Sequence, residues 1–228
     1  MKQLFGPLLI GLLGLSTTAQ AAIVEVSYEG TIYAAYGDGA GYASGDTISG
    51  SLFINTDLAP VDSDPHPSIG NYDNKGGNSG FVSGYAEADS RTVDNVHIRD
   101  ETYNSLDMFS IKDHEWNSFR DNNGNGHYSN KYLIFSAYDY SLDFIQGEGL
   151  EQNFELLKSD LLDGFGGTVY DYSHDIVNYQ QVNRDEGHAF FSLNRLVVST
   201  TSVPEPSAIL LLGAGLAGLG FSRKMNKS

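Results

Sequence analysis

The sequence predicts an all-β protein whose body is a single antiparallel β-sandwich or jelly-roll domain. Short segments that alternate apolar and polar residues recur along the middle of the chain, as half-buried strands do. Clusters of Gly, Asn and Asp, which favour turns, separate these segments at residues 37–39, 74–78 and 122–126. Strands do not alternate with helices, which makes a parallel α/β sheet a poor fit. No repeat of 20–50 residues indicates a solenoid or propeller.

The strand candidates cover much of the chain between its two ends. The alternation is clearest in 188–198, where Phe191 and Leu193 alternate with Ser192 and Asn194. The other candidate strands are 23–28, 31–36, 47–54, 93–99, 106–111, 131–138 and 176–182.

Two segments of the body lack a simple strand pattern. Residues 150–161 fit either a helix, with Leu residues and Phe154 at helical spacing, or a strand around 154–156. Residues 57–80 contain Pro60, Pro65 and Pro67, and we expect them to form a long surface loop.

The composition excludes several classes of protein. The chain has 228 residues, which fits one domain with processing segments at its ends. It has no cysteine, so disulfides, thiolate metal sites and cysteine nucleophiles are excluded. Its 13 Lys and Arg against 29 Asp and Glu argue against a nucleic-acid partner, which needs a basic face. Its 14 Tyr and 12 Phe argue against a disordered chain.

The N-terminal residues 1–21 have the pattern of a secretory signal peptide. Lys2 supplies the positive charge, residues 4–15 form the apolar stretch, and Ala19 and Ala21 form a small-residue cleavage site. We therefore expect export across the inner membrane, with cleavage after Ala21.

The C-terminal residues 203–228 combine a proline-containing motif, an apolar run and a basic tip. The apolar run, 208–221, would be about 21 Å long as a helix, which is short for a hydrocarbon core of about 30 Å. The basic residues Arg223, Lys224 and Lys227 follow it and should keep this end on the cytoplasmic side. This pattern predicts a short apolar helix that anchors the chain in the membrane.

The same tail resembles the PEP-CTERM sorting signal of Gram-negative bacteria. The resemblance is carried by Val203, Pro204, Glu205 and Pro206, by the Gly- and Leu-rich run and by the basic tip at the chain end. It implies recognition by exosortase, a membrane-embedded protease, and transient anchoring followed by transfer to the cell surface or the outside. It also implies an association with exopolysaccharide and biofilm. The body, residues 22–202, resembles no family.

The body is strongly acidic and contains one pattern typical of calcium loops. Once the charged residues of both ends are set aside, 9 basic and 28 acidic residues remain. Asp121, Asn123 and Asn125 place side-chain oxygens at alternate positions before Gly126, as in the first half of such a loop. Tyr132 stands where the last carboxylate ligand is expected, and a plain Asn- and Gly-rich turn fits the segment as well. The only cofactor that we predict is therefore Ca²⁺ at this loop.

No catalytic motif stands out in the body. The six histidines show no metal-binding spacing, and no serine lies in a nucleophile-elbow pattern. Aromatic residues near polar segments are the remaining candidates for ligand contact, by stacking on sugar rings, although strands also favour such residues for packing. They are Trp116, Phe119, Tyr128, Tyr138, Tyr140, Tyr170, Tyr172 and Tyr179.

These observations lead to one functional expectation and two alternatives. We expect a secreted, tail-sorted bacterial protein of the cell surface or exopolysaccharide matrix, with a non-enzymatic structural or interaction role. Its partners would be exosortase, the secretion machinery and extracellular polysaccharide. The first alternative is a carbohydrate-binding module with calcium-stabilised loops, and the second is a secreted glycan hydrolase.

Overall fold

The computed structural model shows an all-β protein and describes residues 22–74, 80–85, 91–92, 94–100 and 106–202. The longest strands are β1 (Ala22–Gly37), β7 (Asp107–Arg120), β8 (Gly126–Asp139), β10 (Gly164–Val177) and β11 (Gln180–Ser202). The shorter strands are β2 (Thr47–Asn55), β3 (Ile69–Asp73), β4 (Val82–Ser83), β5 (Arg91–Thr92), β6 (Asn95–Arg99) and β9 (Phe154–Leu157). Three single turns of 3₁₀-helix complete the elements: η1 (Gly39–Gly41), η2 (Thr56–Leu58) and η3 (Lys158–Asp160).

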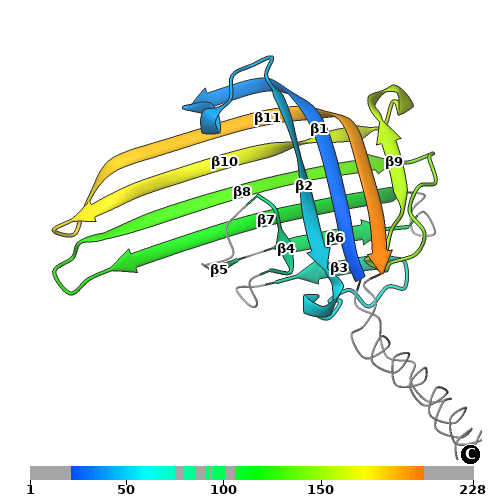
Figure 1. The fold of residues 1–228 in the computed structure, drawn as a ribbon, viewed down its shortest axis with the longest axis horizontal. Coiled ribbons are helices and arrows are strands. Elements are labelled where there is room, and N and C mark those ends of the chain that lie inside the picture. The colour runs from blue at the N-terminus through cyan, green and yellow to red at the C-terminus, as the bar shows by residue number, and fades with distance from the viewer. Residues whose placement is uncertain (1–21, 75–79, 86–90, 93, 101–105, 203–228) are drawn as a thin grey trace, which may run out of the picture. The chain divides into compact units, whose positions relative to one another are not determined.

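All these strands belong to one sheet, which curls over on itself (Figure 1). The strand order is β3-β6-β7-β8-β10-β11-β1-β2-β4, with β5 beside β7 and β9 beside β11. The pairs β1–β2, β6–β7, β7–β8, β8–β10 and β10–β11 are antiparallel. The prediction of an antiparallel all-β body is therefore confirmed. A sandwich or jelly roll would have two separate sheets, whereas the two layers of this body are joined through β11 and β1.

Glycines allow the sheet to curl near Phe191 of β11. A Cβ atom added at Gly167 of β10 would lie 2.5 Å from Phe135 Cβ and 2.7 Å from Phe191 Cζ. A Cβ added at Gly30 of β1 would lie 2.8 Å from Phe191 Cδ2. Side chains cannot approach that closely, so these glycines let the strands bend while the Phe191 ring fills the space above them.

The hydrophobic core lies between the two layers of the curled sheet. The ring of Tyr28 on β1 lies 5.1 Å from the ring of Phe135 on β8 and also contacts Phe191. The fully buried residues alternate along each strand, as a sheet with one core face requires. They include Val24 and Val26 of β1, Leu52 and Ile54 of β2, Phe109 and Ile111 of β7, Leu133 and Phe135 of β8, and Phe191 and Leu193 of β11.

Two facing aspartates hold the connection between β8 and β9 at one end of the sheet. Asp107 and Asp139 are paired across the β7–β8 ladder, and both are buried. Asp107 Oδ2 accepts hydrogen bonds from the backbone N–H groups of Phe144, at 2.6 Å, and Ile145, at 2.7 Å. Asp139 Oδ1 accepts from the N–H groups of Ser141 and Leu142, both at 2.7 Å. The Asp107 carboxylate thus replaces the water that the buried N–H groups of Phe144 and Ile145 would otherwise need, while Asp139 fixes the turn that precedes them.

The structure decides between the two alternatives for residues 150–161 and corrects two other predictions. The segment forms strand β9 and the short turn η3, not a longer helix. The predicted strand 176–182 instead spans a tight turn, because Asn178 and Tyr179 adopt positive φ between β10 and β11. The expected loop 57–80 contains β3, which pairs with β6.

Within the ranges that the structure describes, no helical segment has the length and hydrophobicity needed to cross a membrane. The signal peptide and the sorting helix predicted at the two ends lie outside these ranges.

Candidate functional site

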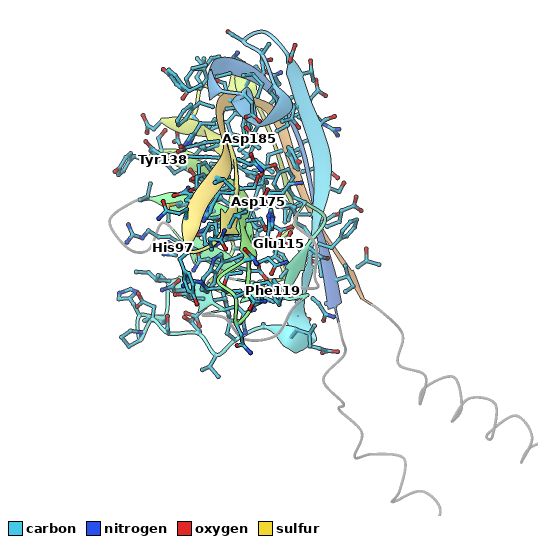
Figure 2. The ribbon with its side chains drawn as sticks, turned by 90° about the vertical axis from the view of Figure 1, so that its left-hand side faces the viewer. His97, Glu115, Phe119, Tyr138, Asp175 and Asp185 are labelled. Atoms are coloured by element: carbon cyan, nitrogen blue, oxygen red, sulfur yellow. The ribbon has the colours of Figure 1, made fainter. Side chains whose placement is uncertain are left out.

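The four long strands β7, β8, β10 and β11 carry very different side chains on their two faces. One face, here called the inner face, contains the core and continues along the strands beyond it. The other is called the outer face. In Figure 2, His97 and Tyr138 lie on the outer side of the sheet, whereas Glu115, Asp175 and Asp185 lie toward the layer of β1 and β2. Residues paired across a ladder point to the same face, so the register of the strands assigns the other side chains to one face or the other.

One row of aromatic rings crosses all four strands on the outer face. His114 of β7 is paired with Tyr132 of β8, Tyr132 with Tyr170 of β10, and Tyr170 with His188 of β11. The ring centroids are 5.7 Å apart for His114 and Tyr132, 5.0 Å for Tyr132 and Tyr170, and 4.3 Å for Tyr170 and His188. Such distances are typical of interacting aromatic pairs, so the row is one continuous strip of rings.

Neighbouring rings extend this strip on both sides. Toward the hairpin tips, Tyr128 stacks on His174 at 5.1 Å and contacts Tyr172 at 5.6 Å. Toward β1, His188 stacks on Phe190, which contacts Tyr33 at 6.4 Å. The rings joined in this way define the outer aromatic face: Tyr33, Tyr36, His114, Trp116, Tyr128, Tyr132, Tyr170, Tyr172, His174, His188 and Phe190.

Polar and cationic groups lie among the rings. The Lys112 ammonium lies 5.2 Å from the centroid of the Tyr132 ring, and the Arg184 guanidinium lies 5.5 Å from that of Tyr172. The Tyr172 hydroxyl accepts a hydrogen bond from Gln181 Nε2 at 2.7 Å. Glu186 pairs with Arg184 and lies 3.5 Å from His188 Nε2. The face therefore offers flat rings together with groups that can bind hydroxyls or charges.

Burial shifts the pKa of two ring hydroxyls and of one imidazole. It raises the pKa of Tyr132 and of Tyr170 further above physiological pH, where a tyrosine hydroxyl is neutral in any case and can donate a hydrogen bond. It lowers the pKa of His114, with Lys112 acting in the same direction. The neutral His114 shares a hydrogen bond of 2.8 Å between Nε2 and Asn130 Oδ1, and its buried Nδ1 has no hydrogen-bond partner among the described residues.

The inner face beyond the core is acidic. Glu115, Lys131 and Asp171 form one row across β7, β8 and β10. Burial raises the pKa of Asp171, with Asp38 and Asp185 adding to the rise and Lys131 opposing it. The Lys131 ammonium also lies 4.9 Å from the centroid of the Tyr85 ring. Among the described residues, no group of three or more His, Asp or Glu is placed to hold a metal ion.

The aromatic residues singled out in the sequence fall into two groups. Trp116, Tyr128, Tyr170 and Tyr172 come together on the outer aromatic face, whereas Phe119, Tyr138, Tyr140 and Tyr179 do not join it. Sequence reasoning missed the seven residues that complete it: Tyr33, Tyr36, His114, Tyr132, His174, His188 and Phe190. A signal was present: along β7, β8 and β10 these residues recur at every second position or multiples of two, as on one face of a strand.

The predicted calcium loop forms the turn between β7 and β8. Asp121 Oδ1 accepts hydrogen bonds from the N–H groups of Asn123 and Asn125, both at 2.8 Å. These bonds, with that from Asn125 first, lower the pKa of Asp121. Asn125 Oδ1 in turn accepts from the N–H of Asn178 in the neighbouring turn. Two of the expected ligand oxygens thus bind backbone groups, and calcium binding at Asp121, Asn123 and Asn125 stays a prediction.

The sorting residues lie outside the described ranges, and a comparison with known families bears on them. They are Ala19 and Ala21, Val203, Pro204, Glu205 and Pro206, and Arg223, Lys224 and Lys227. The family model of the PEP-CTERM protein-sorting motif matches residues 202–224. The tail is a PEP-CTERM sorting motif. It implies an exported protein that is sorted through its tail and processed by exosortase. No curated protein and no solved structure matches the chain.

Proposed function

We propose that this is an exported, PEP-CTERM-sorted protein of the cell surface or extracellular matrix that binds polysaccharide, without catalysis, through the outer aromatic face. The sorting motif supports the destination. The continuous strip of rings from His114 to His188 is the observation that carries the binding role.

The geometry of the strip suits a sugar polymer. The apolar side of a sugar ring packs on a flat aromatic ring, while its hydroxyls bind polar groups at the rim. Rings from β7, β8, β10 and β11 form a row on a sheet, so several consecutive sugars of one chain could be bound side by side. The face would then act as a platform for an extended chain and would not enclose a single small molecule.

A binding assay with a panel of polysaccharides tests this role. The full-length protein is kept in a polyoxyethylene detergent, because a detergent with a sugar headgroup would compete. We expect at least one polysaccharide of the panel to retard the protein when it is included in a native gel. The Tyr170→Ala variant should bind that polysaccharide about fivefold more weakly than wild type, because about 1 kcal/mol of stacking energy is lost. Tyr140, which is 58% exposed and lies outside the face, supplies the control variant Tyr140→Ala.

Two results would contradict the proposal. Equal binding by the Tyr170→Ala and Tyr140→Ala variants would show that the face is not the binding surface. Release of new reducing ends from any polysaccharide, abolished by Asp171→Asn on the inner face, would instead support the hydrolase alternative.

A further inference from the structure

The charges of the four long strands are separated between the two faces of the sheet. The carboxylates on these strands lie almost entirely at inner positions, which are occupied by Asp107, Asp113, Glu115, Asp139, Asp171, Asp175 and Asp185. At outer positions of β7, β8, β10 and β11, Glu186 is the one carboxylate among the described residues, and it is paired with Arg184. The acidic character of the chain therefore does not extend to this face.

The cations show the opposite distribution. Lys112, Arg120 and Arg184 belong to the outer side of these strands, whereas Lys131 of β8 lies on the inner side. Lys112 lies over the Tyr132 ring, and Arg184 lies over the Tyr172 ring. In a body with 9 basic and 28 acidic residues, a surface that carries cations and almost no carboxylates is an exception. Asp73 on the edge strand β3 borders the face, and the Asp73 carboxylate raises the pKa of Lys112, in opposition to burial.

From this separation we propose that the polysaccharide bound by the outer aromatic face is an acidic one, with carboxylate groups along its chain. The inference rests on the proposed function and names the class of its ligand. Rings would stack on the sugars, while Lys112 and Arg184 would lie beside the carboxylates. The carboxylates on the inner side of these strands would repel an acidic chain, so the charges also favour the outer face.

The arrangement favours carboxylates over a denser anion. The cations are few, and each lies beside a ring, which suits a chain with one charge per sugar. Heavily sulfated chains carry more than one charge per sugar, and double-stranded DNA carries one charge per ~1.7 Å of its axis, so both need a more basic surface. A fork-shaped guanidinium such as that of Arg184 also matches a planar carboxylate.

Polygalacturonate and its methyl ester provide a matched pair of probes, because they share one sugar backbone and differ in charge. We expect the full-length protein, in polyoxyethylene detergent, to bind polygalacturonate at least fivefold more tightly than the ester. The variant Lys112→Gln should weaken polygalacturonate binding about fivefold and should weaken binding of the ester by a clearly smaller factor, because the ester has no carboxylate for Lys112 to pair with. Lys158 is exposed on η3, so Lys158→Gln is the control and should bind both probes like wild type.

A second variant distinguishes lost charge from disturbed folding. Ser118 is exposed on β7 and paired with Tyr128, so Ser118→Lys adds a cation beside the rings without burying it. It should tighten polygalacturonate binding severalfold and leave the ester unchanged. A variant that merely unfolds cannot give this result.

The possible results distinguish a wrong ligand class from a wrong proposed function. Equal binding of the two probes, with no effect of Lys112→Gln or Ser118→Lys, would overturn the acidic ligand and leave polysaccharide binding intact. Tighter binding of dextran sulfate, or of single-stranded DNA, than of polygalacturonate would overturn the choice of a carboxylate chain. Failure to bind these probes and every neutral polysaccharide would overturn the proposed function itself.

Discussion

Replacing Gly167 by alanine should destabilise the body, because this glycine lies where the sheet bends. The added Cβ would meet the Phe135 Cβ at 2.5 Å, the Phe191 ring at 2.7 Å and the carbonyl oxygen of Ile134. Ordinary van der Waals contact begins near 3.4 Å, so β8 or β11 must move away. The neighbour is backbone on one side and a fully buried ring on the other, and neither yields easily.

The expected cost follows from the behaviour of overpacked cores. Forcing one extra methyl group into a packed core typically costs about 1–3 kcal/mol. For a domain of this size, each kcal/mol lowers the melting temperature by about 2–4 °C, so Gly167→Ala should lower it by about 2–12 °C. In the matched control, Gly149→Ala, the added Cβ meets nothing within 4 Å, and we expect little change or a slight gain in stability.

Thermal unfolding followed by far-ultraviolet circular dichroism measures both variants against wild type. If Gly167→Ala and Gly149→Ala have the same melting temperature, then β10 does not pass under Phe191 as described. The curl of the sheet would then need another explanation.

Three further predictions concern acid stability, calcium and processing. Hydrogen bonds from Ser141 and Leu142 lower the pKa of Asp139 in the folded protein. Its stabilising effect is therefore present above the pKa of an Asp in the unfolded chain, about 3.9, and is lost as the pH falls below that value. Denaturant titrations from pH 6 to pH 2 should show that the free energy of unfolding depends less on pH for Asp139→Asn than for wild type, and an equal pH dependence of the two would exclude this role. Ca²⁺ bound at the Asp121 loop, at one hundred times its dissociation constant, should stabilise the body by about 2.7 kcal/mol and raise its melting temperature more than Mg²⁺ does. If the Asp121→Ala variant shows the same rise in melting temperature, the loop is a turn and not a calcium site. In cells with exosortase, the intact mass of the mature protein should lack residues 208–228, and a mass that retains them would contradict processing near Pro204–Pro206.

The alternation of apolar residues was sufficient to predict most strands but not their order. Segments 23–28 and 31–36 were recognised separately, and Gly30 between them proved to be inside one strand, where Phe191 covers it. The pairing of β1 with β11 could not be predicted, because the residues that meet there are far apart in sequence: Thr31 and Asn194 share a hydrogen bond across a separation of 163 residues. Local patterns do not encode such partners.

The turn between β10 and β11 was missed for a local reason. Ile176, Val177 and Val182 suggest a strand, and the turn residues Asn178 and Tyr179 are not the Asn-Gly pair that usually marks a two-residue hairpin. The Tyr179 ring is instead held over Gly124 by the neighbouring turn, where Tyr179 N–H donates to the Gly124 carbonyl oxygen at 2.9 Å. A tertiary contact thus stabilises a conformation that the two residues alone do not favour.

The outer aromatic face was predictable in part. Four of its rings were noted as candidates one by one, yet what makes them a surface is register: Tyr170 faces Tyr132 on one side and His188 on the other. A shift of one residue in either ladder would send these rings into the core and the aspartates outward.

The position of β1 and β11 side by side has a consequence for the order of folding. The hairpins β7–β8 and β10–β11 join neighbouring segments and can form early, whereas the β1–β11 ladder closes a loop of more than a hundred and fifty residues. The first and last strands of the body are therefore interior strands, and the sheet is complete only when the final one is present. Any cleavage that releases the body from its tail has to leave β11 whole, because shortening it would open the sheet in its middle and not at its edge.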